Sequence, residues 1–247
     1  MNTAERLARL KKDIDDAFNT GYPAGEKAAY DLYWDAIQNN GKREMYRNFF
    51  IDESWNNNTF KPKYDLRVSN AEGMFHNSKI SGDFVELLEN LGIVLDTSNC
   101  GQMTQMFGNC SEITRLGVLD FSKTGRYYSQ QTFMFCTKLK TIDKIIFSST
   151  EPKQSFYLAF QNCTALENIT VEGVITPDDL TFQWCPLTAE SMQSVISHLK
   201  NFSGTDEEYK HNIVFSSQCW KNLNDKIKPP LYDTWQEYVE YELCWNT

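Results

Sequence analysis

The sequence has few histidines and lacks the residue pairs that usually hold a metal or carry out catalysis. Among its 247 residues, the only histidines are His76, His198 and His211, and no two of the seven cysteines lie within four residues of each other. Zinc sites usually draw on closer Cys or His pairs than these. The common nucleotide-binding, hydrolase and metalloprotease motifs are absent too. We therefore expect no structural metal, no cofactor and no enzyme activity, and we assign no catalytic, cofactor-binding or metal-binding residue.

Long apolar runs are also missing. No stretch approaches the roughly 18 residues that a membrane-spanning helix needs, and the first residues, MNTAERLARLKKDIDD, lack the apolar region of a signal peptide. We expect no membrane insertion and synthesis in the cytoplasm. The odd number of cysteines, without a secretion signal, favours free thiols over disulfides.

Positive charge is in short supply. The chain has 24 Lys and Arg against 33 Asp and Glu, a formal net charge of -9. An acidic surface repels phosphate backbones, so we expect no nucleic-acid partner. The hydrophobic fraction of 41% and the aromatic fraction of 14% indicate a folded chain.

The segment from about residue 70 to residue 187 repeats one motif five times. Each copy places a phenylalanine shortly before a cysteine or serine and an aliphatic residue. The copies are MFHNSKI (74–80), MFGNCSEI (106–113), FMFCTKL (133–139), FQNCTAL (160–166) and FQWCPL (182–187). Their anchor phenylalanines are Phe75, Phe107, Phe133, Phe160 and Phe182. A recurrence of this length is the signature of a solenoid, in which stacked copies form one continuous core.

A hydrophobic ladder follows the cysteine in the central copies. It reads Ile113, Leu116, Leu119 and Phe121 in one copy and Leu139, Ile142, Ile145 and Phe147 in the next. The segments LGIVLDTS (91–98) and LGVLDFS (116–122) match each other apart from one inserted residue. A unit with one short strand cannot bury its apolar side alone, so we expect each Phe, Cys and Leu to stack on its counterparts.

The repeat cysteines Cys110, Cys136, Cys163 and Cys185 allow more than one interpretation. A buried free cysteine acts as a small hydrophobic residue, and the constant register favours that role. Stacking could also bring neighbouring thiols close enough for accidental disulfides. A nucleophilic pair of Cys163 and His198 is the catalytic alternative, because a nucleophilic thiol needs a base.

The phenylalanine, cysteine, leucine and isoleucine spacing resembles the BspA-like class of leucine-rich repeats, over roughly residues 70–187. Ser78 stands where the other copies have cysteine, and the repeats are longer than the commonest length of that class. The resemblance implies an α+β chain with a leucine-rich-repeat solenoid, a helical N-terminal region and an α/β C-terminal cap. It also implies adhesion to host proteins or surfaces.

We expect four regions. Residues 1–24 contain an N-terminal helix, 25–69 a helical and irregular cap, 70–187 the leucine-rich repeats, and 188–247 a C-terminal cap. In the helix over 3–18, Leu7, Leu10, Ile14 and Ala17 have the spacing of a short coiled-coil seam. The seam predicts either packing on its own domain or assembly with further copies or a virion partner.

The flanks of the repeats predict further elements. A second helix is expected over 26–38, ending at the NNG sequence before Lys42. After the repeats, we expect a helix that begins at Thr188 and buries Met192, Val195, Ile196 and Leu199. A short strand over 211–215 and a final helix over 232–245 should complete the C-terminal cap.

A second resemblance lies upstream of the repeats. Residues 25–50, GEKAAYDLYWDAIQNNGKREMYRNFF, are similar to a block that precedes such repeats in proteins of phages and prophages of gut bacteria. It implies a phage virion (tail or decoration) or bacterial surface-adhesion component.

We therefore expect a non-enzymatic binding or structural protein that displays its repeat surface to a protein or cell-surface ligand. The alternative is a thiol-dependent hydrolase that uses a repeat cysteine with a histidine. The motif leaves the binding residues unknown. GRYYSQQ (125–131) could supply contact area through Tyr127 and Tyr128, with one of the two rings expected to face the core.

Overall fold

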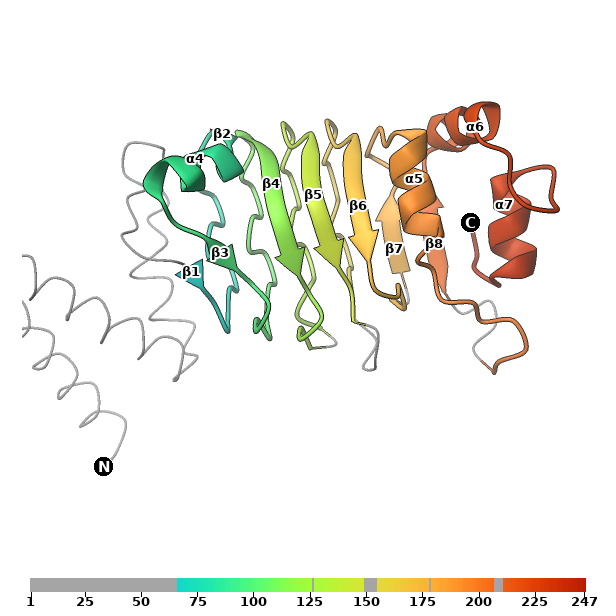
Figure 1. Ribbon diagram of the computed structural model, residues 1–247, viewed down its shortest axis with the longest axis horizontal. Coiled ribbons are helices and arrows are strands. Elements are labelled where there is room, and N and C mark those ends of the chain that lie inside the picture. Colours follow the sequence, from blue (N-terminus) through green and yellow to red (C-terminus); the bar gives the residue numbers. More distant parts are fainter. Residues whose placement is uncertain (1–65, 126, 149–154, 178, 207–210) are drawn as a thin grey trace, which may run out of the picture. The chain divides into compact units, whose positions relative to one another are not determined.

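The described part of the chain winds into a parallel β-solenoid. The computed structural model describes residues 66–125, 127–148, 155–177, 179–206 and 211–247. Four strands form its main sheet in the order β2–β4–β5–β6, and all pairs are parallel (Figure 1). Their bounds are Gly82–Asp83 for β2, Ile113–Asp120 for β4, Thr141–Ile146 for β5 and Asn168–Glu172 for β6. The expected repeat solenoid is confirmed.

The strands align the hydrophobic ladder in register. Leu116 lies opposite Ile142, which lies opposite Ile169, and all three side chains are buried. The next inward residues along β4 and β5, Leu119 and Ile145, follow after three positions, whereas a regular strand alternates every two. The pairing of β5 with β6 accommodates this spacing by a register shift between Ile142 and Ile145.

Between the strands the chain returns along the opposite side of the solenoid, behind the sheet in Figure 1. We call residues 71–78, 103–110, 129–136 and 156–163 the return segments. They adopt positive φ two residues after each anchor phenylalanine, and that position is occupied by Asn77, Asn109, Phe135 and Asn162. Asparagine tolerates this left-handed conformation better than most residues.

Backbone hydrogen bonds link each return segment to the next. The amide of Phe75 donates to the carbonyl of Met106 at 2.8 Å, that of Phe107 to Thr132 at 2.8 Å and that of Phe133 to Ala159 at 2.9 Å. The return side is therefore held together across turns as the strand side is, although it contains no regular strand over these segments.

The anchor phenylalanines form one column inside the solenoid. Adjacent ring centroids lie 5.1 Å apart for Phe75 and Phe107, 6.3 Å for Phe107 and Phe133, and 5.2 Å for Phe133 and Phe160. The column continues through Phe182 at 4.6 Å from Phe160. All five rings are buried, so the expected stacking is confirmed.

The first turn contains a helix that the repeat pattern does not predict. α4 (Phe84–Leu91) begins at Asp83, whose side chain accepts from two backbone amides, and ends at Gly92 in the left-handed conformation. Phe84 packs edge-on against both Phe75 and Phe107, with ring centroids 5.2 and 5.8 Å apart, and so lies beside the first two rings of the column. After α4, β3 (Leu95–Asp96) pairs in parallel with β1 (Leu66–Arg67).

The matching segments 91–98 and 116–122 end in the same local structure. The carboxylate of Asp96 accepts from the amide of Ser98 at 3.0 Å, and that of Asp120 accepts from the amide of Ser122 at 2.7 Å. The hydroxyl of Thr97 links the two turns by accepting from the amide of Asp120 at 2.7 Å. The sequence match therefore reflects equivalent positions in successive turns.

The C-terminal part confirms the helix at Thr188 and the strand after it. α5 (Ala189–Ile196) begins at Thr188 and buries the expected apolar side chains, while β8 (Asn212–Phe215) pairs with β7 (Asp179–Phe182). α6 (Ser217–Lys226) was not predicted. The helix expected over 232–245 is shorter, because α7 (Trp235–Glu237) continues into a π-helix, η1 (Tyr238–Glu242), and ends before the buried Trp245.

One rung of the repeat escaped the motif search. Phe215 stacks on Phe182 with centroids 5.4 Å apart, and the Cys219 thiol donates to the carbonyl of Cys185 at 3.3 Å. Cys219 follows Phe215 by four positions, whereas the cysteine of each recognised copy follows its phenylalanine by three. The extra residue hides the copy from a search at fixed spacing. Phe215 extends the column, whereas the Cys219 thiol bonds Cys185 and not the anchor phenylalanine Phe182.

Helix α5 ends the main sheet by replacing the next strand. The amide of Ile169 in β6 donates to the hydroxyl of Ser191 at 3.0 Å, and the amide of Val171 donates to the hydroxyl of Ser194 at 2.9 Å. These two amides point away from β5 and would otherwise form an open edge, which promotes pairing with other chains. Two serines one helical turn apart therefore satisfy the edge.

The expected helices over 3–18 and 26–38, and the seam of Leu7, Leu10 and Ile14, lie outside the described residues. So does the block 25–50. Among the helices of the described part, none has the length and apolar character required to cross a membrane.

Replacing Phe133 by alanine should lower the free energy of unfolding by about 3–5 kcal/mol, because it leaves a cavity in the middle of the column. Chemical denaturation measures this loss. The control is Phe135→Asn, two residues away: its ring is partly exposed and its φ of 63° suits asparagine, so stability should hold or rise slightly. Equal losses in both variants would contradict the column.

The serine pair gives a second test. Ser191→Ala should cost about 1–3 kcal/mol, because the buried amide of Ile169 loses its acceptor. Ser197→Ala is the control at the C-terminal end of the same helix, where its exposed hydroxyl donates to the carbonyl of Ser194 at 3.0 Å and lies 3.2 Å from Nδ1 of His198, without contacting the strand edge. A Ser191→Ala variant as stable as the Ser197→Ala variant would show that the edge does not need the hydroxyl.

Candidate binding surface

The repeat cysteines lie in the core and use their thiols as hydrogen-bond donors. Each thiol donates to the carbonyl of the anchor phenylalanine in the preceding turn: Cys110 to Phe75 at 2.8 Å, and Cys136 to Phe107 at 3.0 Å. Cys163 repeats the contact with Phe133 at 3.0 Å. All seven cysteines are buried and free. The interpretation of the repeat cysteines as small core residues is confirmed, and the thiol bond to the preceding turn adds a role that the sequence did not predict.

Burial keeps these thiols protonated. Desolvation raises the pKa of Cys110 and of Cys163 to about 12, and it raises the pKa of Cys136 as well. His198, the base of the catalytic alternative, donates from Nδ1 to the carbonyl of Ser194 at 2.7 Å. Cys163 and His198 thus have different partners, and a buried neutral thiol is a poor nucleophile.

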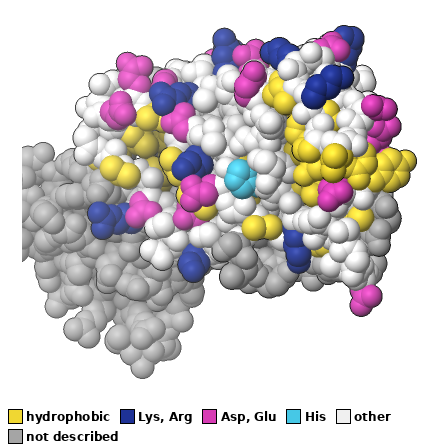
Figure 2. Space-filling model, turned by 45° about the vertical axis from the view of Figure 1, so that its right-hand side comes forward, with side chains coloured by type: hydrophobic (Ala, Val, Ile, Leu, Met, Phe, Trp, Pro, Cys, Tyr) yellow, Lys and Arg dark blue, Asp and Glu magenta, His cyan; other side chains and the backbone are white. Residues whose placement is uncertain are grey.

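The outer face of the main sheet carries charges that pair with one another across the strands. Arg115 in β4 bonds both oxygens of Asp143 in β5, at 2.8 and 2.9 Å, and contacts Asp83 in β2 at 3.2 Å. Lys144 in β5 pairs with Glu172 in β6 at 2.8 Å. Figure 2 shows basic side chains beside acidic ones over the molecular surface. This face is therefore a network of cross-strand pairs.

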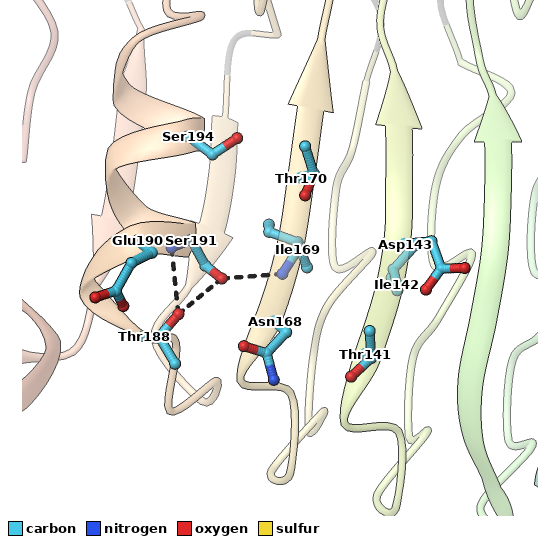
Figure 3. A pocket seen from close by; sticks show the side chains of 10 residues that line it. All are labelled: Thr141, Ile142, Asp143, Asn168, Ile169, Thr170, Thr188, Glu190, Ser191 and Ser194. Carbon is cyan, nitrogen blue, oxygen red and sulfur yellow. Dashed lines mark hydrogen bonds between the residues drawn. The ribbon is translucent and has the colours of Figure 1, made fainter.

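A shallow groove of about 480 Å³ lies between this face and α5 (Figure 3). Its lining is polar and includes Thr141, Asp143, Asn168 and Thr170 from the strands and Glu190 from the helix. The hydroxyls of Thr188 and Ser191 at its helical side bond each other at 2.9 Å, and Ser191 also accepts from β6. These two hydroxyls serve the helix cap and the strand edge, so the groove follows from how the sheet ends.

The return side has a different chemistry. Residues 99–110, 127–136 and 155–163 contain no Asp, Glu, Lys or Arg, although 23% of the whole chain is charged. Burial does not explain this, because many side chains of these segments are partly or fully exposed. We call the exposed side of these three segments the return face. Aromatic and amide side chains of successive turns lie next to one another on this face.

Four aromatic rings are exposed on the return face. The exposed fractions are 60% for Tyr127, 48% for Tyr128, 39% for Phe135 and 55% for Tyr157. The expectation that Tyr127 or Tyr128 faces the core is wrong, because the phenylalanines of neighbouring turns already fill that space. Exposed aromatic rings on rigid backbone are typical of interaction surfaces.

Local structure holds two of these rings in place. The ring of Tyr128 lies over Gly125, where any Cβ would come within 2.7 Å of a ring carbon, so Gly125 makes room for it. Phe135 has a φ of 63°, at the position where three other turns have asparagine. A bulky residue is strained there. The Phe135 side chain is 39% exposed and is not part of the phenylalanine column.

Amide side chains bridge neighbouring turns beside the rings. Gln105 donates to Gln131 at 2.6 Å, and Gln130 donates to Ser155 at 3.3 Å. A primary amide can form about four hydrogen bonds, so each glutamine keeps further donors and acceptors for another molecule. The bridges fix the orientation of these groups along the solenoid.

The sequence pattern points to Tyr127 and Tyr128 as surface residues. It does not point to Tyr157 and Phe135, which the structure also exposes. Two signals in the sequence could have found them. One is the absence of charge from residues 99–110, 127–136 and 155–163, and the other is a phenylalanine at the position where Asn77, Asn109 and Asn162 stand. Neither signal can be interpreted from the sequence, because only the register of the stacked turns shows that these positions lie on the same side of the solenoid.

The raised thiol pKa values predict a loss of stability in alkali. The unfolded chain releases the thiol protons near pH 9, whereas the folded chain holds those of Cys110 and Cys163 up to about pH 12. The stabilisation that the buried, protonated thiols contribute is therefore fully present below pH 9. Above pH 9 each thiol should lower the free energy of unfolding by about 1.4 kcal/mol per pH unit.

Denaturant unfolding between pH 7.5 and 10.5 measures this slope. Cys163→Ala is the comparison, because it removes one of the thiols. The free energy of unfolding of this variant should fall less steeply with pH, by about 1.4 kcal/mol per pH unit, which corresponds to one proton. Equal slopes in the two proteins would show that the Cys163 thiol is not shielded in the folded chain.

Comparison of this chain with family models, curated proteins and solved structures gave no match.

Proposed function

We propose that this chain is a non-enzymatic binding protein that displays its repeat surface to a protein or cell-surface ligand. The return face carries the proposal. It exposes four aromatic rings and several bridged amides on a backbone that is hydrogen-bonded from turn to turn. A rigid platform loses little conformational freedom when a ligand binds, which favours affinity.

We further propose that the solenoid is a BspA-like leucine-rich-repeat array. The support is the recurrence of anchor phenylalanine, cysteine and aliphatic ladder in one register, with the side chains of each type stacked on their counterparts. The chain would act as a phage virion component (tail or decoration) or as a bacterial surface adhesin. The resemblance of residues 25–50 to phage and prophage proteins supports this setting. Residues 3–18 would attach the protein to further copies or to a virion partner.

The thiol-dependent hydrolase remains the alternative, and no contact in the described residues favours it. A hydrolase of that kind would need an accessible thiolate next to a base. Burial instead raises the pKa of Cys110, Cys136, Cys163 and Cys185. Their thiols also donate to backbone carbonyls of the preceding turn.

Binding of the fluorescently labelled full chain to bacterial and animal cells tests the function. The wild type should bind at least one cell type, and a Tyr127→Ser, Tyr128→Ser double variant should lose most of that binding, because the surface loses two exposed rings. Tyr241→Ser is the matched control, since Tyr241 is 63% exposed in the C-terminal cap.

Two results would contradict the proposal. One is a wild type that binds no cell type. The other is a double variant that binds as well as the Tyr241→Ser control, which would locate binding outside the return face.

A further inference from the structure

We propose that the ligand of the return face is a neutral glycan chain that lies across several turns of the solenoid. This inference rests on the proposed binding function and adds the chemical class of the ligand. Three observations support it: exposed rings held in fixed places, amide groups bridged along the solenoid, and the absence of charge over three successive segments.

Exposed aromatic rings suit the apolar faces of sugars. The C–H groups on one side of a pyranose carry a small positive potential, and the face of an aromatic ring carries a negative one. Tyr128 and Tyr157 are exposed on neighbouring segments of the return face, 127–136 and 155–163. The two segments are linked by the backbone amide of Gln131, which donates to the carbonyl of Tyr157 at 3.0 Å. Two rings on adjacent turns offer successive stacking positions to a chain of sugars.

The amide groups suit the hydroxyl groups of the same ligand. A sugar hydroxyl both donates and accepts, and a primary amide offers both functions in one plane. Gln105 and Gln131 join neighbouring turns, as do Gln130 and Ser155. The backbone repeat from turn to turn is about 4.8 Å in a parallel solenoid, so these groups recur at a short and regular interval along the axis.

The absence of charge argues for a neutral ligand. An anionic polymer would be recognised by Lys or Arg, and an uncharged surface on a chain of net charge -9 does not attract it. Protein interfaces are enriched in arginine beside their aromatic residues, and residues 99–110, 127–136 and 155–163 contain none. A neutral glycan is recognised by rings and amides without an ion pair.

Phe135 adds an independent observation. Its φ of 63° is strained for phenylalanine, while Asn77, Asn109 and Asn162 occupy the equivalent place in other turns. Its side chain is 39% exposed and lies outside the phenylalanine column. A ring kept at a position where asparagine would be more stable is explained by contact with a ligand.

Native gels that contain a dissolved polysaccharide test the proposal with the full chain. The neutral probes are a linear glucan, a galactan and a mannan, and the anionic probes are alginate and heparin. Migration of the wild type should be retarded by at least one neutral polysaccharide and by neither anionic one. Tyr157→Ala should weaken the retardation roughly threefold to tenfold, while Tyr157→Phe, which keeps the ring, should retain it.

Phe135→Asn separates binding from stability. It should weaken retardation while the melting temperature holds or rises, because asparagine relieves the strained backbone. Tyr241→Ser, in the C-terminal cap, should migrate like the wild type. A merely structural role for Phe135 predicts the reverse: unchanged retardation, or weaker retardation together with a lower melting temperature.

The outcomes distinguish the two proposals. If cells bind the wild type through the return face but no neutral polysaccharide retards it, the ligand is a protein and the glycan proposal is overturned alone. Retardation that is as strong with alginate or heparin also overturns it. If the wild type binds neither cells nor polysaccharides, both proposals fail.

Discussion

The solenoid depends on hydrogen bonds that join each turn to the next on both of its sides. Parallel strands supply them on one side, and the amides of the return segments supply them on the other. The phenylalanine column and the cysteine thiols occupy the space between. Each repeat cysteine donates to the carbonyl of the preceding anchor phenylalanine, so the polar part of the thiol is satisfied while its bulk fills the core. One small residue thus combines packing with a link between turns.

The two sides of the solenoid differ because their backbones differ. The strand side is a regular surface on which opposite charges on adjacent strands face each other, as Arg115 does with Asp83 and Asp143. The return side turns sharply and repeats a positive φ at each rung, which favours asparagine and glycine. Over residues 99–110, 127–136 and 155–163 its exposed positions carry amides and rings and no charge. The charges of the strand face pair with one another, whereas the glutamine amides of the return face keep hydrogen-bonding capacity beyond the bonds between turns.

The ends of the sheet show how a solenoid avoids an open edge. At one end Phe84 of α4 packs edge-on beside the first two rings of the phenylalanine column. At the other end α5 supplies the hydroxyls of Ser191 and Ser194 to the amides of β6, while β8 continues the return side for one more rung. The two sides thus end at different points along the chain, and the groove beside α5 marks the place where the strand side stops first.

Sequence alone determined the repeat, the buried phenylalanines and the helix at Thr188, because these depend on spacing that stacking preserves. It could not determine α4, α6 or the rung of Phe215, since an inserted helix or one extra residue breaks the spacing while the phenylalanine column continues. The surface was the least predictable part. The sequence predicts contact area at Tyr127 and Tyr128, but whether both rings face outward depends on how neighbouring turns fill the core. Tyr157 and Phe135 join them only in three dimensions, because residues almost thirty positions apart in the sequence become neighbours when the turns stack.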